Sequence, residues 1–180
     1  MEIGGVKKFL LFYQKAIYKS VKILYNIYRK KREVIEMEKE ICFDMDGTMA
    51  DLYAVDGWLP MLRAYDPTPY VKAEPMLNMS AFARLLHKAQ RLGYKIVIIS
   101  WLSKTSTADY DMAVTQAKIE WLKNHLPSVI WDNIYIVSYG TPKHELASGI
   151  LFDDEEYNRN MWGQGAYEPN EILEFLRGLE

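Results

Sequence analysis

Apolar and polar residues form two different patterns along this chain. Short, largely apolar runs, typical of strands buried on both faces, occupy residues 40–43, 94–100, 133–138 and 150–152. Apolar residues recur every three or four positions, as in amphipathic helices, in residues 79–91, 110–124 and 170–179, and a shorter helix fits residues 143–147. This alternation predicts an α/β fold, with a doubly wound (Rossmann-like) parallel sheet and helices on both faces.

The first part of the chain carries a helical stripe whose other face is basic. The apolar positions are Val6, Leu10, Tyr13, Ile17, Val21, Leu24 and Tyr28. Residues 1–36 hold nine Lys or Arg and three Asp or Glu, a net charge of +6, which leaves −8 for the remainder because the whole chain carries −2. We therefore predict an N-terminal basic amphipathic helical arm, residues 1–36, and a separate domain, residues 37–180. Three interpretations of the arm stay open: it lies on an anionic membrane surface, it packs on a partner or a second copy of itself, or Met37 is the true start.

Cysteine content and charge narrow the compartment and the partners. The single cysteine, Cys42, lies in an apolar run and has no second cysteine to pair with, so we expect it to be buried in a protein of a reducing compartment. The apolar runs are too short for a membrane span or a signal peptide, and we expect a cytoplasmic protein. An acidic domain argues against a stable nucleic-acid complex. The pattern leaves the oligomeric state open.

Residues suited to phosphate chemistry follow the predicted strands. The first strand ends in Asp44-Met45-Asp46-Gly47-Thr48, the second in Ser100 and the last in Asp153-Asp154, while Lys143 follows the third after a short loop. Ligands of such sheets bind at the carboxyl ends of the strands, so these side chains are expected to share one site.

The types of these residues suggest how a phosphate ester is hydrolysed. We predict Asp44 as the nucleophile, Asp46 as the acid/base, and a Mg²⁺ cofactor with Asp44, Asp46, Asp153 and Asp154 as its metal site. Ser100 and Lys143, together with the turn at Gly47 and Thr48, are predicted to bind the phosphate oxygens. The substrate is then a small phosphorylated molecule.

Four motifs in the same order resemble those of the haloacid dehalogenase (HAD) superfamily. Ile-Cys-Phe-Asp-Met-Asp-Gly-Thr-Met-Ala-Asp at residues 41–51 resembles the first motif, Val97-Ile98-Ile99-Ser100 the second, Lys143 the third and Leu151-Phe152-Asp153-Asp154 the fourth. The resemblance covers about residues 38–180. It implies a magnesium-dependent phosphatase with an aspartyl-phosphate intermediate, because a second aspartate two residues after the nucleophile marks the phosphatases and phosphotransferases of this superfamily. A phosphomutase stays open.

Other segments of the chain indicate which class of substrate to expect. Four segments resemble the arrangement in the 5'(3')-deoxyribonucleotidases: Lys118-Ile-Glu-Trp121-Leu, Trp131-Asp132-Asn133, Pro142-Lys143-His144 and Phe152-Asp153-Asp154. This resemblance implies a nucleoside monophosphate, although Trp101 after Ser100 departs from that family. A small cap at about residues 52–78 is rich in aromatic residues, which either stack on a nucleobase or fill the core of the cap. The alternatives are a polynucleotide-end or sugar phosphatase, and a non-catalytic binding protein of the same fold.

Four further polar residues allow two interpretations each. Lys118 is the rival of Lys143 for the third motif, but it lies in the middle of a predicted helix, so we expect it on the solvated helix surface. Asp51 either contacts the site or caps the segment that follows it. Asn158 and Asn160 either orient the acidic pair or face water.

Overall fold

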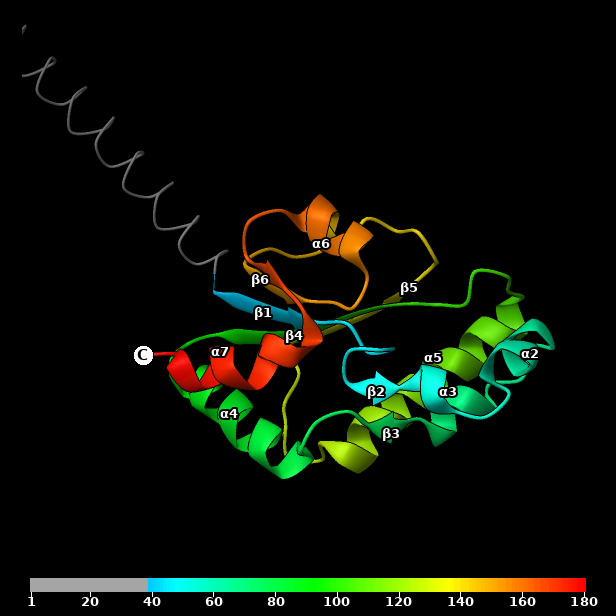
Figure 1. Ribbon diagram of the computed structural model, residues 1–180, viewed down its shortest axis with the longest axis horizontal. Coiled ribbons are helices and arrows are strands. Elements are labelled where there is room, and N and C mark those ends of the chain that lie inside the picture. Colours follow the sequence, from blue (N-terminus) through cyan, green and yellow to red (C-terminus); the bar gives the residue numbers. More distant parts are fainter. Residues whose placement is uncertain (1–38) are drawn as a thin grey trace, which may run out of the picture. The chain divides into compact units, whose positions relative to one another are not determined.

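A computed structural model describes residues 39–180, and a five-stranded parallel sheet lies at its centre (Figure 1). The strands are β1 (Glu40–Phe43), β4 (Lys95–Trp101), β5 (Asn133–Val137), β6 (Ile150–Phe152) and β7 (Ala166–Tyr167). They lie in the order β5-β4-β1-β6-β7, and all neighbours are parallel. The predicted fold class is confirmed, and β7 is a strand that the sequence pattern did not indicate.

Helices cover both faces of this sheet (Figure 1). One core joins α4 (Met79–Arg91), α5 (Ala108–His125) and α7 (Ile172–Gly178) to the face that carries Phe43 and Ile98. The other face carries Cys42 and Val97 and packs against Trp162, at the end of α6 (Glu156–Trp162). Cys42 is buried, as predicted. The segment expected as a short helix at 143–147 is a single 3₁₀ turn, η2 (Lys143–Glu145), and a second such turn, η3 (Pro169–Glu171), precedes α7.

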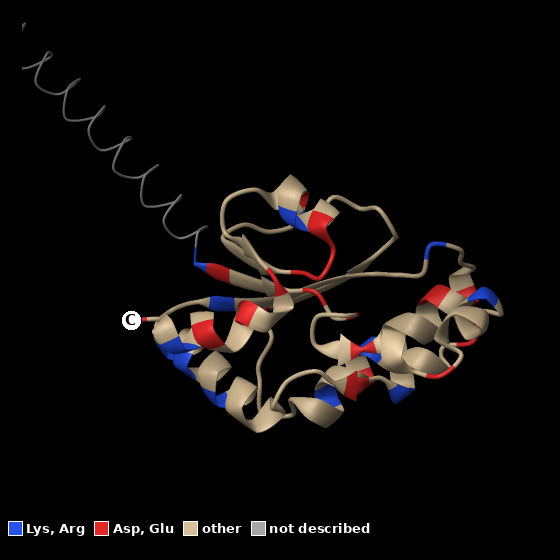
Figure 2. Cartoon of the chain, in the orientation of Figure 1, with Lys and Arg blue, Asp and Glu red and all other residues tan. Residues whose placement is uncertain are grey.

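The register of the strands brings their carboxyl ends to one edge. Phe43, the last residue of β1, pairs with Ile98 on one side and Phe152 on the other. The Asp44 N–H donates to the Phe152 carbonyl at 2.9 Å, which extends the ladder by one residue. Acidic segments directly follow β1 and β6 in Figure 2. The edge where we predicted the chemistry is therefore lined by carboxylates.

A small subdomain is inserted between β1 and α4. It opens and closes with an antiparallel pair, β2 (Ala50–Asp51) and β3 (Glu74–Pro75), and contains η1 (Leu52–Ala54), α2 (Trp58–Arg63) and α3 (Thr68–Lys72). Leu52 and Tyr70 pack against Val114 of α5 in a second, smaller core. The Asp51 carboxylate accepts from the Ala54 N–H at 3.1 Å, so this residue caps η1. These elements occupy most of the range predicted as a cap.

The predicted helical arm, residues 1–36, lies outside the described residues. Among the helices of residues 39–180, none combines the length and the apolar character needed to cross a bilayer.

Candidate active site

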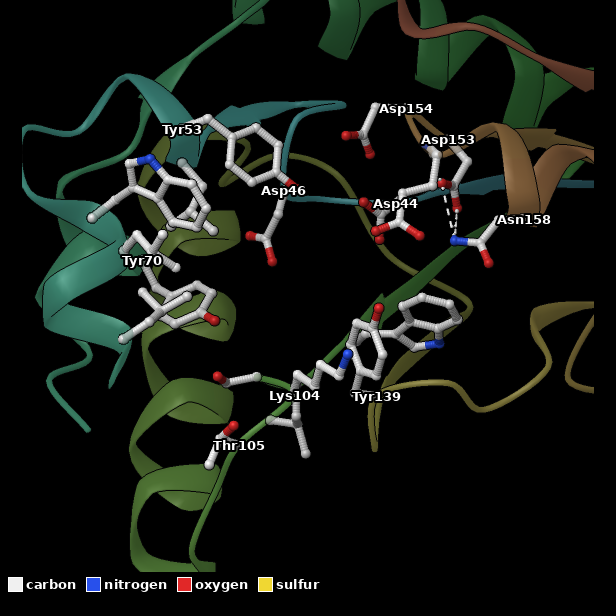
Figure 3. Close-up of a pocket in the computed structure, with 18 of the residues that line it drawn as sticks. Asp44, Asp46, Tyr53, Tyr70, Lys104, Thr105, Tyr139, Asp153, Asp154 and Asn158 are labelled. Atoms are coloured by element: carbon white, nitrogen blue, oxygen red, sulfur yellow. Dashed lines mark hydrogen bonds between the residues drawn. The ribbon is translucent and has the colours of Figure 1, made fainter. Parts of the chain in front are cut away.

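Three aspartates meet at the ends of two neighbouring strands. Asp44 follows β1, Asp153 and Asp154 follow β6, and each offers a carboxylate oxygen that lies within 4.8 Å of those of the other two (Figure 3). Asp44 and Asp153 are buried, and Asp154 is half-buried. Carboxylate oxygens are the ligands that hard divalent cations such as Mg²⁺ prefer. The donor set therefore fits the predicted metal.

A buried lysine joins two of these aspartates. Lys143 Nζ donates to Asp44 Oδ1 at 2.7 Å and to Asp153 Oδ2 at 2.6 Å. Burial alone lowers the pKa of Lys143, but the two carboxylates outweigh burial, so its pKa is raised and the side chain stays an ammonium. Lys143 thus holds a positive charge beside the predicted nucleophile.

Burial and neighbouring charge both disfavour ionisation of the acidic pair after β6. Burial, followed by the charge of Asp44, raises the pKa of Asp153 to about 6 and that of Asp154 to about 7. Both carboxylates therefore ionise less readily than they do in water. A cation bound between them would remove this cost, which agrees with the fit of the donor set.

Neighbouring side chains fix the loop that carries the pair. Asn158 is buried and its Nδ2 donates to both carboxylate oxygens of Asp153 at 3.2 Å, so it orients Asp153 and does not face water. Arg159 Nη1 donates to the carbonyls of Asp153 and Asp154 at 2.8 and 2.7 Å. Thr48 is also buried, and its Oγ1 accepts from the Asp154 N–H at 3.1 Å.

Gly47 lies where the loops after β1 and β6 approach each other. Its φ is +74°, and a Cβ there would lie 2.4 Å from Asp154 Oδ2 and 2.6 Å from Tyr53 Cε2. Only glycine fits both this backbone conformation and this space. Gly47 therefore permits the close approach of the first and fourth motifs.

Lys118 is buried, which corrects our expectation of a solvated helix position. It is 1% exposed, and its Nζ donates to Asp46 Oδ2 at 2.6 Å, to Ser100 Oγ at 2.7 Å and to the Trp101 carbonyl at 2.9 Å. The expectation was wrong because a helix position was judged by its charge. Lys118 in fact belongs to the apolar stripe of α5, with Val114, Ala117, Trp121 and Leu122, which are all buried.

Asp46 lies outside the cluster of three aspartates, although we predicted it as part of the metal site. Its side chain pairs with Lys118 and is not one of the three clustered carboxylates. Burial raises the pKa of Asp46, and the charge of Lys118 counteracts part of this increase. A carboxyl group with a raised pKa holds a proton more readily than an ordinary aspartate, which suits a general acid.

A cavity of about 410 Å³ lies over these residues and has aromatic walls. Tyr53 and Tyr70 lie on one side, and Lys104 and Tyr139 on another (Figure 3). Tyr53 packs edge-to-face on Trp58, with 5.1 Å between ring centroids. Trp101, also in the wall, lies 4.9 Å from the Tyr139 ring and beneath Lys143.

The predicted residues take different places around the cavity. Five line it: Asp44, Asp46, Lys143, Asp153 and Asp154. Three others, Gly47, Thr48 and Ser100, are buried and are not among its lining residues. Thr48 and Ser100 instead support Asp154 and Lys118 through their hydroxyl oxygens.

Sequence reasoning missed two contributors. Arg159 was not singled out, and only its spacing from the acidic pair hints at its contact with that loop. Tyr139 follows β5 in a polar turn, and no periodicity marks it as a wall of the cavity.

Comparison with known proteins identifies a family and a similar fold. The model of the 5' nucleotidase, deoxy (pyrimidine), cytosolic type C protein family (NT5C) matches residues 74–166, just over half of the chain, a range that contains Ser100, Lys118, Lys143 and the acidic pair. D,D-heptose 1,7-bisphosphate phosphatase from Burkholderia thailandensis has a similar structure, with a TM-score of 0.50 and 12% identity over 77% of this chain and 96% of that chain. This second likeness concerns the fold alone. No curated protein sequence matches the chain.

Proposed function

The chain belongs to the 5' nucleotidase, deoxy (pyrimidine), cytosolic type C protein family and is a HAD-type phosphatase, and on this premise we propose that it hydrolyses a nucleoside monophosphate with Mg²⁺ through an aspartyl-phosphate. The observation that carries the proposal is the convergence of Asp44, Lys143 and the acidic pair on the floor of one cavity.

The three clustered aspartates, Asp44, Asp153 and Asp154, would hold the Mg²⁺. When bound, the cation supplies positive charge that neutralises the carboxylates and polarises a phosphate oxygen. Asn158 keeps the Asp153 carboxylate in its orientation through two hydrogen bonds. Ligand orientation by such a neighbour commonly matters for affinity.

Asp44 would act as the nucleophile. One of its oxygens forms a bond to phosphorus while the bond between phosphorus and the ester oxygen breaks, which leaves a phosphate on Asp44 and an alcohol. Lys143, 2.7 Å from Asp44 Oδ1, holds the carboxylate in place and offers its charge to the phosphoryl oxygens.

Asp46 would move the proton. In its neutral form it donates the proton to the departing alkoxide, and as a carboxylate it then takes one from the water that attacks the aspartyl-phosphate. Phosphate leaves, and both aspartates return to their starting states. The raised pKa of Asp46 supports the first of these roles.

The aromatic walls support a planar leaving group. Tyr53 and Tyr139 are 44% and 47% exposed and line the cavity on different sides, so their rings are available to a substrate. Every nucleobase offers a face on which such rings can stack. Tyr70 also lines the cavity but is buried in the small core with Leu52, so we assign the stacking role to the exposed Tyr53 and the core-filling role to Tyr70.

Asp44→Asn tests the nucleophile. We expect it to abolish Mg²⁺-dependent release of phosphate from p-nitrophenyl phosphate and from deoxynucleoside monophosphates, because an amide cannot attack phosphorus. Asp51→Asn is the matched control, since it makes the same change in charge at a residue that only caps η1. Retention of activity by Asp44→Asn, with an unchanged circular dichroism spectrum, would contradict the assignment.

A substrate panel tests the nucleotide. Deoxynucleoside and nucleoside monophosphates, sugar phosphates and oligonucleotides phosphorylated at the 3' or 5' end should be compared by kcat/KM. We expect a nucleoside monophosphate to be preferred. A preference for sugar phosphates or oligonucleotide ends would leave the catalytic residues in place and overturn the substrate assignment.

A further inference from the structure

Lys118 joins three elements of the fold at a single ammonium group. It extends from α5 and binds Asp46 in the loop after β1 and both Ser100 and Trp101 at the end of β4. Three hydrogen bonds use all three donors of a lysine ammonium. The Tyr70 ring, with its centroid 5.0 Å from Nζ, covers the same group. The ammonium is thus fully coordinated although it is removed from water.

The contact with Asp46 occupies one carboxylate oxygen. Oδ2 accepts from Lys118, and among the described residues Oδ1 has no hydrogen-bond partner. The Asp46 side chain lines the cavity and remains 18% exposed, whereas that of Lys118 is 1% exposed. Lys118 therefore holds Asp46 from the protein side, and a substrate meets the other oxygen.

We propose that Lys118 is a positioning residue for the acid/base: its ammonium fixes the Asp46 carboxyl group so that Oδ1 faces the ester oxygen of the substrate. This inference rests on the proposed function, because it assumes that Asp46 transfers the proton. Lys118 also donates to the hydroxyl of Ser100, which leaves the hydrogen of that hydroxyl to be donated elsewhere. Lys143 contacts the nucleophile and Lys118 contacts the acid/base, so the two buried lysines have separate roles.

A purely structural role for Lys118 makes a different prediction. If the lysine only joined α5 to the sheet, its loss would lower the amount of folded enzyme and reduce the hydrolysis of all substrates by the same factor. If it positions the acid, its loss matters most where the leaving group needs a proton. The ratio of two rates from one enzyme sample separates these cases, because the folded fraction cancels.

The test compares an alkyl phosphate with p-nitrophenyl phosphate, whose leaving group departs without protonation. kcat/KM is the quantity to measure, because it reports phosphoryl transfer to Asp44 and not the later hydrolysis. In Lys118→Met we expect kcat/KM for the alkyl phosphate to fall by about 100-fold or more, as for the loss of a positioned acid. The value for p-nitrophenyl phosphate should fall much less. Lys118→Gln, which keeps a hydrogen-bond donor, provides the second variant if the methionine variant does not fold.

Two comparisons complete the experiment. Lys123→Met removes an exposed lysine of the same helix and should leave the ratio of the two substrates unchanged. Adding Lys118→Met to Asp46→Asn should cause no further fall in the ratio, because the lysine acts through this carboxylate. An unchanged ratio in both Lys118 variants, or an equal fall in the two Asp46 backgrounds, overturns the inference. Absence of hydrolysis by the unmodified enzyme overturns the proposed function, and this inference with it.

Discussion

Lys143→Met removes the ammonium that separates two buried carboxylates. Lys143 Nζ lies 2.7 Å from Asp44 and 2.6 Å from Asp153, and the side chains of all three are at most 8% exposed. Methionine has a similar length and no charge, so the change leaves two unpaired acids and little change in volume. Loss of one partner from a buried ion pair costs about 3–5 kcal/mol.

This cost should appear in thermal unfolding. For a chain of this size, 1 kcal/mol corresponds to roughly 2–4 °C in Tm, so Lys143→Met should melt about 6–20 °C lower in EDTA. The lower end applies if Asp153 takes up a proton, since its pKa is already raised to about 6. Excess Mg²⁺ should raise the Tm of this variant more than that of the unmodified protein, because a bound cation stabilises the folded state and here replaces the missing charge.

Circular dichroism melts in EDTA and in MgCl₂ measure both effects, and Lys123→Met is the control for loss of an exposed lysine. We also expect Lys143→Met to lose nearly all phosphatase activity in both buffers. An unchanged Tm in EDTA would mean that the aspartates do not need Lys143. An equal response to Mg²⁺ in both proteins would mean that the cation binds elsewhere.

Two further predictions follow from the same loops. Gly47→Ala should lower both Tm and activity, because strain at φ +74° costs about 1–3 kcal/mol and the new Cβ would lie 2.4 Å from Asp154 Oδ2. Gly140→Ala, at φ +83° with nothing within 4 Å, is the control for strain alone and should leave activity unchanged in the Mg²⁺-dependent assay. In EDTA, the Tm of the unmodified protein should rise as the pH falls through 7 and 6. The pKa values of Asp154 and Asp153 are raised in the folded state to about 7 and about 6, from the ordinary aspartate value of 3.8. Between the raised values and 3.8 the folded state therefore binds more protons than the unfolded state, and protonation stabilises it. A Tm that falls steadily as the pH is lowered across this range would contradict the raised pKa values.

The sequence predicts the centre of this molecule well because parallel strands leave two local signals. Their burial on both faces produces apolar runs such as Ile96-Val97-Ile98-Ile99, and their carboxyl ends meet at one edge. A side chain directly after such a run, as Asp44 and Asp153 are, must therefore lie near those of the neighbouring strands. The positions of these two aspartates therefore follow from the local sequence pattern and the sheet topology.

The missed features depend on contacts between distant segments. β7 has two residues, Ala166 and Tyr167, and forms by pairing with β6, so no periodicity can reveal it. Lys118 was misplaced because lysine usually faces water. Its burial requires an acceptor from the first motif, 72 positions earlier in the chain, and two from the end of β4, so it could be recognised only once the fold had brought these groups together.

Charge balance supports the proposal that this site uses both lysines and a cation. Asp44, Asp46, Asp153 and Asp154 face two ammonium groups, which leaves an excess of two negative charges when all are ionised. A phosphate monoester approaches as an anion, so such a site would repel it. One divalent cation at the clustered aspartates would cancel this excess, and Asp46, which pairs with Lys118, lies outside that cluster. In the proposed mechanism this separation assigns the two aspartates different partners: Asp44, beside the cation, attacks phosphorus, and Asp46, held by Lys118, transfers the proton.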